Sequence, residues 1–347
     1  MAIIWIDGYD HYGSTGANLT AGAYAANTGS CVCKNSFSRT GGWCLSSSGS
    51  SSANLRKALG SSITAVGIGW SIYFPSLPGT IVELLKFNDA SNGNQLTVWL
   101  NTTGTIRVTR GTASGTNILG ETASPAISNG SWNHLEIKAT FSNTTGTVEI
   151  RANEAIVLNL TGLDTVATAN VECSQIEIFP TPTSSASGGI DDMFIWDTSG
   201  TENNDFIGDR RVIMLSPSAN EATQEWTASS GSAYAAIDDT APDGDTTYIE
   251  ADDAVPVTSE FALTDAAATV GAISAVQTVV MARRVEAVST VMQVSLLSGG
   301  DVDAGASHSI GDAYAYYTDI SELNPDTGAP WTRTALNAAT LRLRRTT

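Results

Sequence analysis

Charged residues are scarce in this sequence, and basic ones are the scarcest. Asp, Glu, Lys and Arg make up 15% of the 347 residues against 42% hydrophobic residues, and only four lysines occur, all in the first half. Two domains of ordinary size fit this length, and the apolar content excludes an intrinsically disordered chain. The polar remainder is mostly Thr, Ser, Gly and Asn between short β-branched runs, a composition typical of all-β proteins.

The shortage of basic residues limits the possible partners. Lys and Arg number 17 and Asp and Glu 35, which gives a formal net charge of −18. Phosphate groups would be repelled, so nucleic acids and anionic membrane surfaces are poor partners. Long hydrophobic runs are also missing, and the opening MAIIWIDGYDHY lacks the basic segment of a secretory signal. We therefore expect a protein without a signal peptide, assembled in a cytoplasm.

Cysteine and histidine are too few and too scattered to predict a metal centre or a nucleophilic site. Cys31, Cys33 and Cys44 have the spacing C-x-C-x10-C, which with a distant Cys173 matches no common zinc site. In a reducing cytosol we expect free thiols or a late-forming bridge from Cys44 to Cys31 or Cys33. No Gly-x-Ser-x-Gly motif or Cys–His constellation accompanies the histidines, and the sequence predicts no enzyme. The three histidines are His11, His134 and His308.

What the sequence has in abundance is short alternating strands. In TVEIRA, Val148 and Ile150 alternate with Glu149 and Arg151, the pattern of a half-buried strand. Turn signals such as NTTG and SNTTG separate successive segments. The first two hundred residues therefore predict two packed antiparallel sheets. The expected strands are 65–74, 81–89, 95–101, 105–111, 132–141, 146–160 and 172–179.

A change of pattern predicts a domain boundary near 198–204. The apolar strand DDMFIWD ends there, TSGTENND has linker chemistry, and FIGDRRVIMLSP begins a new apolar run. In the second half, VQTVVMARRVE (276–286) is apolar on both faces and predicts a central strand, because its β-branched residues disfavour a helix. The segment 332–341 fits either a helix or a loop that leads into the last strand.

With these residues in view, the chain resembles a group of tailed-bacteriophage virion proteins. They begin with a concanavalin A-like (laminin-G/pentraxin-type) antiparallel jelly-roll sandwich and carry a second β-rich domain. The resemblance implies a jelly roll of the lectin/glucanase type at 1–200, whose first and last strands pair, and a β-sandwich-like assembly or attachment domain at 201–347. The matching segments are IIWIDGYDHY, SRTGGWCL, GGIDDMFIWD, NNDFIGDRRV, DDTAPDGDTTYIEAD and NPDTGAPWT.

The paired acids Asp191 and Asp192 fall on the final strand of that sandwich. The resemblance implies that this motif pins the strand to its neighbour. As a catalytic pair they fail on geometry, since adjacent strand residues point to opposite faces. The E-x-D-x-x-E signature of the related glucanases is absent, and Glu172 to Glu177 is its nearest imitation.

Oxygen-rich acidic segments make calcium the candidate cofactor, because lectin-like sandwiches hold Ca²⁺ with Asp, Asn and carbonyl oxygens at a loop rim. Neither of the two segments has EF-hand spacing, and solvated turn acids are the alternative. The dense second segment runs from Asp238 to Asp253. The candidate ligands are Asp197, Asn203, Asp205, Asp209, Asp243 and Asp245.

Aromatic and arginine side chains are the candidate binding groups. Sugar rings stack on exposed aromatic faces, although a tryptophan within a strand is often a core residue. The glycan-binding candidates are Tyr9, His11, Trp43 and Trp99. Arginines in an acidic second half suit electrostatic docking onto another subunit, and the last strand, LRLRRTT, invites edge pairing with a second copy. The assembly candidates are Arg210, Arg211, Arg342, Arg344 and Arg345.

Together these features predict a non-enzymatic structural protein of the tailed-phage virion. We expect a homo-oligomer in contact with other virion subunits, associated with the tail as a fibre, tip or baseplate component. Its lectin-like domain would bind host surface polysaccharide. A capsid decoration or head-fibre protein that uses the same fold for cementing is the alternative, and a glycan-degrading enzyme is a third reading.

Overall fold

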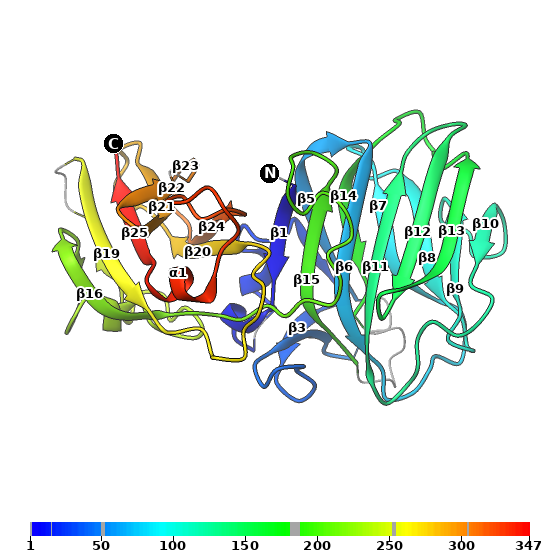
Figure 1. The fold of residues 1–347 in the computed structure, drawn as a ribbon, viewed down its shortest axis with the longest axis horizontal. Helices are drawn as coiled ribbons and strands as arrows, with labels where there is room; N and C mark the ends of the chain where they lie inside the picture. Colours follow the sequence, from blue (N-terminus) through cyan, green and yellow to red (C-terminus); the bar gives the residue numbers. More distant parts are fainter. Residues whose placement is uncertain (1, 15, 50–52, 181–187, 252–254, 304) are drawn as a thin grey trace. The chain divides into compact units, whose positions relative to one another are not determined.

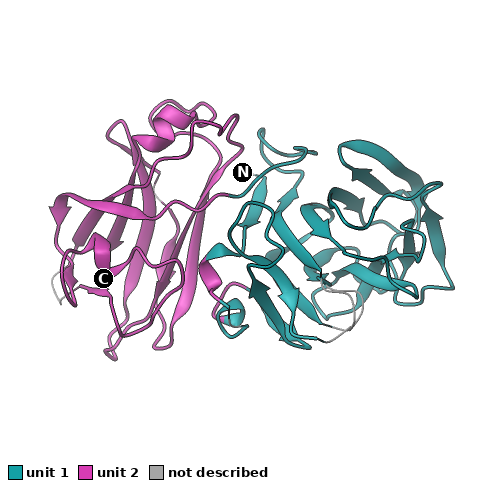
Figure 2. Ribbon diagram, turned by 90° about the horizontal axis from the view of Figure 1, so that it is seen from below, with its two compact units in different colours: residues 1–10, 14–20, 24–212 teal, residues 11–13, 21–23, 213–347 magenta. Residues whose placement is uncertain are grey.

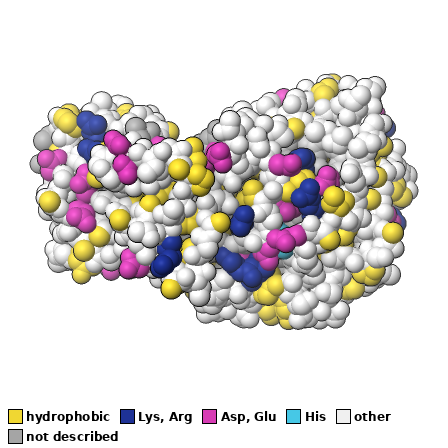
Figure 3. All heavy atoms as spheres, viewed as in Figure 1, with side chains coloured by type: hydrophobic (Ala, Val, Ile, Leu, Met, Phe, Trp, Pro, Cys, Tyr) yellow, Lys and Arg dark blue, Asp and Glu magenta, His cyan; other side chains and the backbone are white. Residues whose placement is uncertain are grey.

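The computed structural model describes residues 2–14, 16–49, 53–180, 188–251, 255–303 and 305–347 of the chain. These residues form strands with only short helical turns between them, which confirms the prediction of an all-β protein (Figure 1). Among the described residues no helix is long and apolar enough to span a membrane. Most of the surface seen in Figure 3 is uncharged, as the composition predicts.

The chain divides into two compact units, shown in separate colours in Figure 2. Unit 1 comprises residues 1–10, 14–20 and 24–212, and unit 2 comprises residues 11–13, 21–23 and 213–347. The sequence alone predicts a boundary after residue 200. In the structure residues 201–212 cluster with unit 1, because the end of this segment is bound to the surface of a unit 1 sheet.

Unit 1 consists of two antiparallel sheets. Sheet A has the order β13-β12-β11-β6-β15-β4-β3, with β1 paired to β15, and sheet B has the order β10-β9-β8-β7-β14-β5-β2. The strands of sheet A are β1 (Ile3–Asp7), β3 (Cys31–Lys34), β4 (Cys44–Ser47), β6 (Ala65–Tyr73), β11 (Trp132–Thr140), β12 (Gly146–Ala152), β13 (Ala155–Leu163) and β15 (Gly189–Asp197). Those of sheet B are β2 (Ala26–Thr28), β5 (Asn54–Ile63), β7 (Val82–Asn88), β8 (Asn94–Leu100), β9 (Ile106–Arg110), β10 (Ile118–Glu121) and β14 (Cys173–Ile178). Two 3-10 turns, η1 (Asp10–Tyr12) and η2 (Asn18–Thr20), follow β1.

Strand alternation places the core between the sheets. On β6 the residues Val66, Ile68, Trp70 and Ile72 are fully buried, and they alternate with Gly67, Gly69 and Ser71 on the outward face. The predicted pairing of the first and last strands is confirmed, since β1 pairs antiparallel with β15.

Two glycines of β6 allow aromatic rings to lie on the outward face of sheet A. A Cβ at Gly67 would lie 2.2 Å from the ring of Trp196, and one at Gly69 would lie 2.2 Å from the ring of Phe194. No side chain fits into such gaps, so only glycine lets these rings rest directly on the neighbouring strand.

All four cysteines are free, buried thiols. Burial raises the pKa of Cys31, Cys44 and Cys173 to about 12. Thiolate is the reactive form, so these thiols are inert at neutral pH.

Unit 2 is built on a six-stranded sheet of order β16-β19-β25-β21-β22, with β23 also on β21. Two small ladders, β17–β18 and β20–β24, complete its strands. The bounds are β16 (Pro217–Gln224), β17 (Thr227–Ala228), η3 (Tyr234–Ala236), β18 (Ile249–Glu250), β19 (Val257–Leu263), β20 (Val276–Ala282), β21 (Val291–Ser298), β22 (Asp301–Asp303), β23 (Ser307–Ser309), β24 (Ala315–Ser321), α1 (Arg333–Asn337) and β25 (Thr340–Arg345).

Two expectations about unit 2 are corrected by these ladders. The segment at 276–286 does contain a strand, but β20 pairs only with β24 and is not central. It is rich in apolar residues because it packs against two core clusters, with Val280 in one and Val276 in the other. The last strand, β25, lies between β19 and β21, so neither of its edges is open for pairing with another copy. The segment 332–341 forms the short helix α1 and then enters β25.

Candidate functional site

A bulge in β15 brings the two adjacent aspartates to the same side of sheet A. The register against β6 shifts between Asp191 and Phe194, and Asp192 has a φ of 54°. A left-handed residue at a bulge turns the chain by one position. Both carboxylates then accept hydrogen bonds from Arg39, which shows that the predicted opposite orientation of Asp191 and Asp192 is wrong.

Arg39 joins this aspartate pair to a distant part of the chain. Its backbone N–H donates to Asp191 at 2.9 Å, and its guanidinium contacts Asp192 at 3.1 Å and Asp209 at 2.6 Å. The guanidinium also donates to the Ser71 hydroxyl on β6. The side chain is only 7% exposed, so a buried cation balances the buried acids.

The segment 205–212, named the strap here, is fastened across the outward face of sheet A by carboxylates. Glu136 on β11 accepts the N–H groups of Ile207 at 2.9 Å and Gly208 at 3.1 Å. Asp192 accepts the N–H of Val212 at 2.8 Å. These bonds satisfy backbone groups that have no strand partner, and they fix the path of the strap.

Phe206 anchors the other end of the strap. Its ring lies 3.8 Å from the Arg151 guanidinium carbon and packs edge-on against Trp196. Lys138 on β11 adds an ion pair with Asp205 at 2.6 Å. The strap is therefore held by packing, cation–π contact and charge together.

His134 lies beneath the strap and is 1% exposed. Its Nδ1 is 3.4 Å from the Ser71 hydroxyl and 3.7 Å from an oxygen of Asp209. A Ser-His-Asp triad needs the serine and the acid on different ring nitrogens, so this arrangement is not a triad. Among the described residues no group bonds to His134 Nε2.

Burial shifts the pKa values of this cluster in opposite directions. Burial, followed by the nearby charge of Asp192, raises the pKa of Asp191 to about 8. It raises the pKa of Asp192 to about 6, although the Val212 N–H and Arg39 favour the charged form. Burial lowers the pKa of His134 to about 4, with Asp209 opposing the shift. At neutral pH the cluster therefore holds a protonated Asp191, an ionised Asp192 and a neutral His134.

Next to this closed cluster, the same face of sheet A carries three partly exposed rings, named the aromatic trio here. Tyr73 on β6 and Trp132 on β11 stand directly opposite each other in the ladder, with ring centroids 5.7 Å apart. Phe37, from the loop between β3 and β4, stacks on Tyr73 at 5.8 Å. The flanking loop residues are small, uncharged and exposed: Asn35, Ser36, Asn129, Gly130 and Ser131. The trio offers ring faces beside uncharged hydrogen-bonding groups.

The predicted glycan-binding residues are not brought together. Tyr9 is fully buried and Trp99 is 7% exposed, with its indole N–H bonded to Thr109, so neither ring can stack on a sugar and both assignments are wrong. Trp43 is partly exposed in unit 1, and its backbone N–H donates to Asp10. His11 clusters with unit 2. Strand alternation alone could not tell an outward ring from a covered one.

The carboxylates predicted to bind calcium are largely occupied by protein groups. Asp205 pairs with a lysine, Asp209 with two arginines and Asp245 with Arg283. Asp197 accepts hydrogen bonds from Ser199, and Asp243 accepts them from Thr247. Asn203 takes a left-handed turn conformation with a φ of 49°. Asp252 and Asp253 of the dense acidic segment lie outside the described residues.

The part of the chain that the structure describes holds no group of three or more His, Cys, Asp or Glu side chains placed to bind a metal.

The predicted assembly arginines fall into different settings. Arg211 is 45% exposed and contacts Asp192 and Asp209, so it belongs to the strap cluster, with Arg210 beside it. Arg342 and Arg344 are partly exposed on β25. Arg345 ends the same strand and donates to the carbonyl of Thr347.

Comparisons with known proteins find likeness in fold only. No protein-family model and no curated protein matches the chain. The solved structures it resembles include alginate lyase Aly36B, at 13% identity over 56% of this chain and 95% of that one, with a TM-score of 0.33. Carbohydrate-binding module CBM66 from Bacillus subtilis matches at 10% identity over 50% and 94%, with a TM-score of 0.33.

A third neighbour is Trypanosoma rangeli sialidase in complex with 2,3-difluorosialic acid. It matches at 13% identity over 44% of this chain with a TM-score of 0.32, and the match spans 25% of the sialidase. These neighbours are carbohydrate-binding and sialidase-like β-sandwich folds. At these TM-scores the likeness carries no argument about ligand or activity.

Proposed function

We propose that this chain is a non-enzymatic structural protein of the tailed-phage virion, whose first unit is a concanavalin A-like jelly roll that binds a glycan of the host surface. The sequence motifs that resemble such virion proteins motivate the phage assignment. The acidic, lysine-poor composition suits a protein that meets neither nucleic acid nor an anionic membrane. A tail-associated position as fibre, tip or baseplate component would place unit 1 against the host.

The observation that carries the glycan proposal is the aromatic trio. Phe37, Tyr73 and Trp132 are partly exposed on the outward face of sheet A, and neighbouring rings lie within 6 Å of each other. Sugar rings bind to such faces through their C–H groups, and exposed Asn and Ser bind hydroxyls. Neither of the loop segments 35–38 and 129–131 contains a charged residue. A neutral polysaccharide is therefore the ligand class that fits.

Binding rather than catalysis is favoured by the state of the nearby acids. Asp191 is 1% exposed and Asp192 is fully buried, and both accept hydrogen bonds from Arg39. A glycosidase needs one carboxyl open to the glycosidic oxygen and another open to water or the sugar. Here the same groups hold the strap and the loop before β4 in place.

The glycan proposal is tested with purified protein and polysaccharide from the host envelope. Phe37→Ala and Trp132→Ala should each weaken binding about fivefold or more, because loss of a contact ring at a binding site costs about 1 kcal/mol or more. Tyr248→Ala, which removes a partly exposed ring from unit 2, is the matched control and should bind like the unaltered protein. Unchanged binding by both trio variants, with normal thermal melting, would remove the trio as the site.

The alternative is a capsid decoration or head-fibre protein that uses the same fold for cementing. Quantified gel bands of purified virions separate the two locations, because hundreds of copies indicate the head surface and about three to a few dozen indicate the tail. A depolymerase is the third candidate. It would release reducing sugar from the polysaccharide, and Asp191→Asn would abolish that release.

A further inference from the structure

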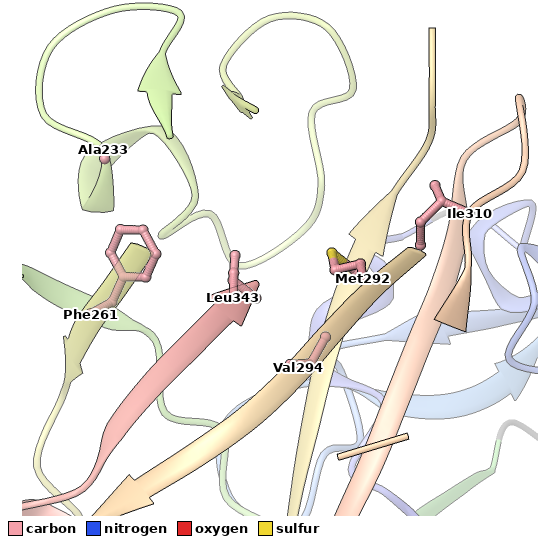
Figure 4. Close-up of a cluster of buried hydrophobic side chains, with 6 residues drawn as sticks. All are labelled: Ala233, Phe261, Met292, Val294, Ile310 and Leu343. Carbon is pink, nitrogen blue, oxygen red and sulfur yellow. The ribbon is translucent and has the colours of Figure 1, made fainter. Parts of the chain in front are cut away.

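The six-stranded sheet of unit 2 buries one of its faces. Phe261 on β19, Leu343 on β25, and Met292 and Val294 on β21 are at most 3% exposed and form one hydrophobic cluster. Figure 4 shows their side chains on three adjacent strands. Strand alternation therefore turns the residues between them to the opposite face of the sheet.

That opposite face, named the arginine face here, is polar and centred on β25. Arg342 lies between Glu260 of β19 and Ser295 of β21, and Arg344 lies between Thr258 and Gln293. Arg342 makes a loose ion pair with Glu260 at 3.6 Å, in which its side chain is 27% exposed. Arg344 is partly exposed, and within the described parts of the chain it makes no ion pair. Its charge is therefore available to a partner.

The two arginines of this face contrast with the acidic composition of the rest of unit 2. Residues 213–347 contain 18 acidic and 6 basic side chains, a net charge of −12. The segment 238–250 contributes exposed carboxylates on a different part of the same unit. They are Asp238, Asp239, Asp243, Asp245 and Glu250. Every copy of the chain thus carries two partly exposed arginines on one sheet face and a surplus of exposed acid elsewhere in unit 2.

We propose that the arginine face of one copy docks the acidic segment 238–250 of a second copy. The contact joins two different surfaces, so it is a head-to-tail contact that builds rings or filaments rather than closed pairs. Arg342 and Arg344 carry it, whereas Arg211 is engaged within unit 1 and Arg345 lies at the end of β25 on the other face. This docking rests on the proposed function, because it assigns the residues of the assembly contact. Its test needs neither virions nor glycan, so the docking and the glycan-binding proposal can fail separately.

The test is sedimentation velocity of the full chain at low salt and at about 0.5 M salt, where charge attraction is screened. The unaltered protein should associate at low salt and dissociate at high salt. Arg344→Glu should weaken association at least tenfold, and so should the pair Asp239→Lys and Asp243→Lys. Arg333→Glu on α1 is the matched control and should associate normally, because it reverses the same charge away from the arginine face.

The decisive experiment mixes the Arg344→Glu variant with the double variant Asp239→Lys, Asp243→Lys. Each surface then finds a partner of opposite sign, so association should return to the level of the unaltered protein. Thermal melting of each variant separates loss of docking from loss of folding. A monomer at low salt, equal loss with Arg333→Glu, or no recovery on mixing well-folded variants would each overturn the proposal.

Discussion

The protonated state of Asp191 leads to a prediction about stability against pH. The side chain is 1% exposed, and its pKa in the folded protein is about 8 against an ordinary value of 3.8. Between these two values the folded protein holds a proton that the unfolded chain has lost. The contribution of Asp191 to stability is therefore fully present below pH 3.8, falls progressively between pH 3.8 and about 8, and is lost above that pH.

The size of the effect follows from the two pKa values. Between pH 7 and pH 9 the folded carboxyl changes from mostly protonated to mostly ionised, while the unfolded one stays ionised. The free energy of unfolding of unit 1 should fall by about 1.4 kcal/mol over this interval through Asp191 alone. Asp191→Asn keeps a neutral side chain of the same shape and removes this dependence.

The measurement is chemical denaturation of both proteins at several pH values, followed by hydrogen exchange of the β6 and β11 amides so that unit 1 is read separately. The difference between the two proteins should change by about 1.4 kcal/mol from pH 7 to pH 9, since all other titrating groups cancel. Asp301→Asn, which alters an exposed carboxyl of unit 2, should follow the unaltered protein. A constant difference across this range would refute a protonated Asp191.

Three further predictions follow from the packing and charges of unit 1. Gly69→Ala should lower the free energy of unfolding by about 2 kcal/mol in thermal melts, because its Cβ would overlap the ring of Phe194. A melting curve like that of the unaltered protein would contradict this close packing. Glu136→Ala should raise the rate of amide hydrogen exchange at Ile207 and Gly208 about tenfold, and Glu136→Gln should raise it less. Unchanged exchange rates would show that the strap is held by other contacts. Addition of Ca²⁺ or of a chelator should leave the melting temperature unchanged, because candidate ligands such as Asp205 and Asp245 are already paired with basic side chains. A clear rise with Ca²⁺ would restore calcium as a cofactor.

The sheets were predictable because alternating apolar and polar residues along a strand indicate which side chains face the core. Strand β12 follows the pattern residue by residue. On β11, Leu135 and Ile137 are fully buried as their spacing indicates, but His134 and Glu136 on the outward face are buried as well. The pairing of β1 with β15 followed from the family resemblance rather than from alternation. It joins residues nearly two hundred positions apart, which local patterns cannot specify.

The candidate site was less predictable because its geometry depends on the bulge in β15 and on the strap that lies across sheet A. Asp192 reaches the same side as Asp191 only through a left-handed backbone conformation, which Asp adopts without a distinct sequence signal. Lys57 shares the buried face of β5 with Leu55, and its ammonium lies 3.0 Å from the Trp5 ring centroid. A lysine is rarely buried, so residue type gave no indication of this position. The aromatic trio was not predicted because Tyr73 is the last residue of β6 and Trp132 the first residue of β11. Only the pairing of these two strands shows that the rings face each other.

An NMR titration of the tryptophan indole N–H signals with host envelope polysaccharide decides whether the aromatic trio binds glycan. The Trp132 signal should shift and saturate while the covered Trp99 signal stays in place and no reducing sugar appears. A shift confined to Trp99, or release of sugar from the polymer, would contradict a binding face at the aromatic trio.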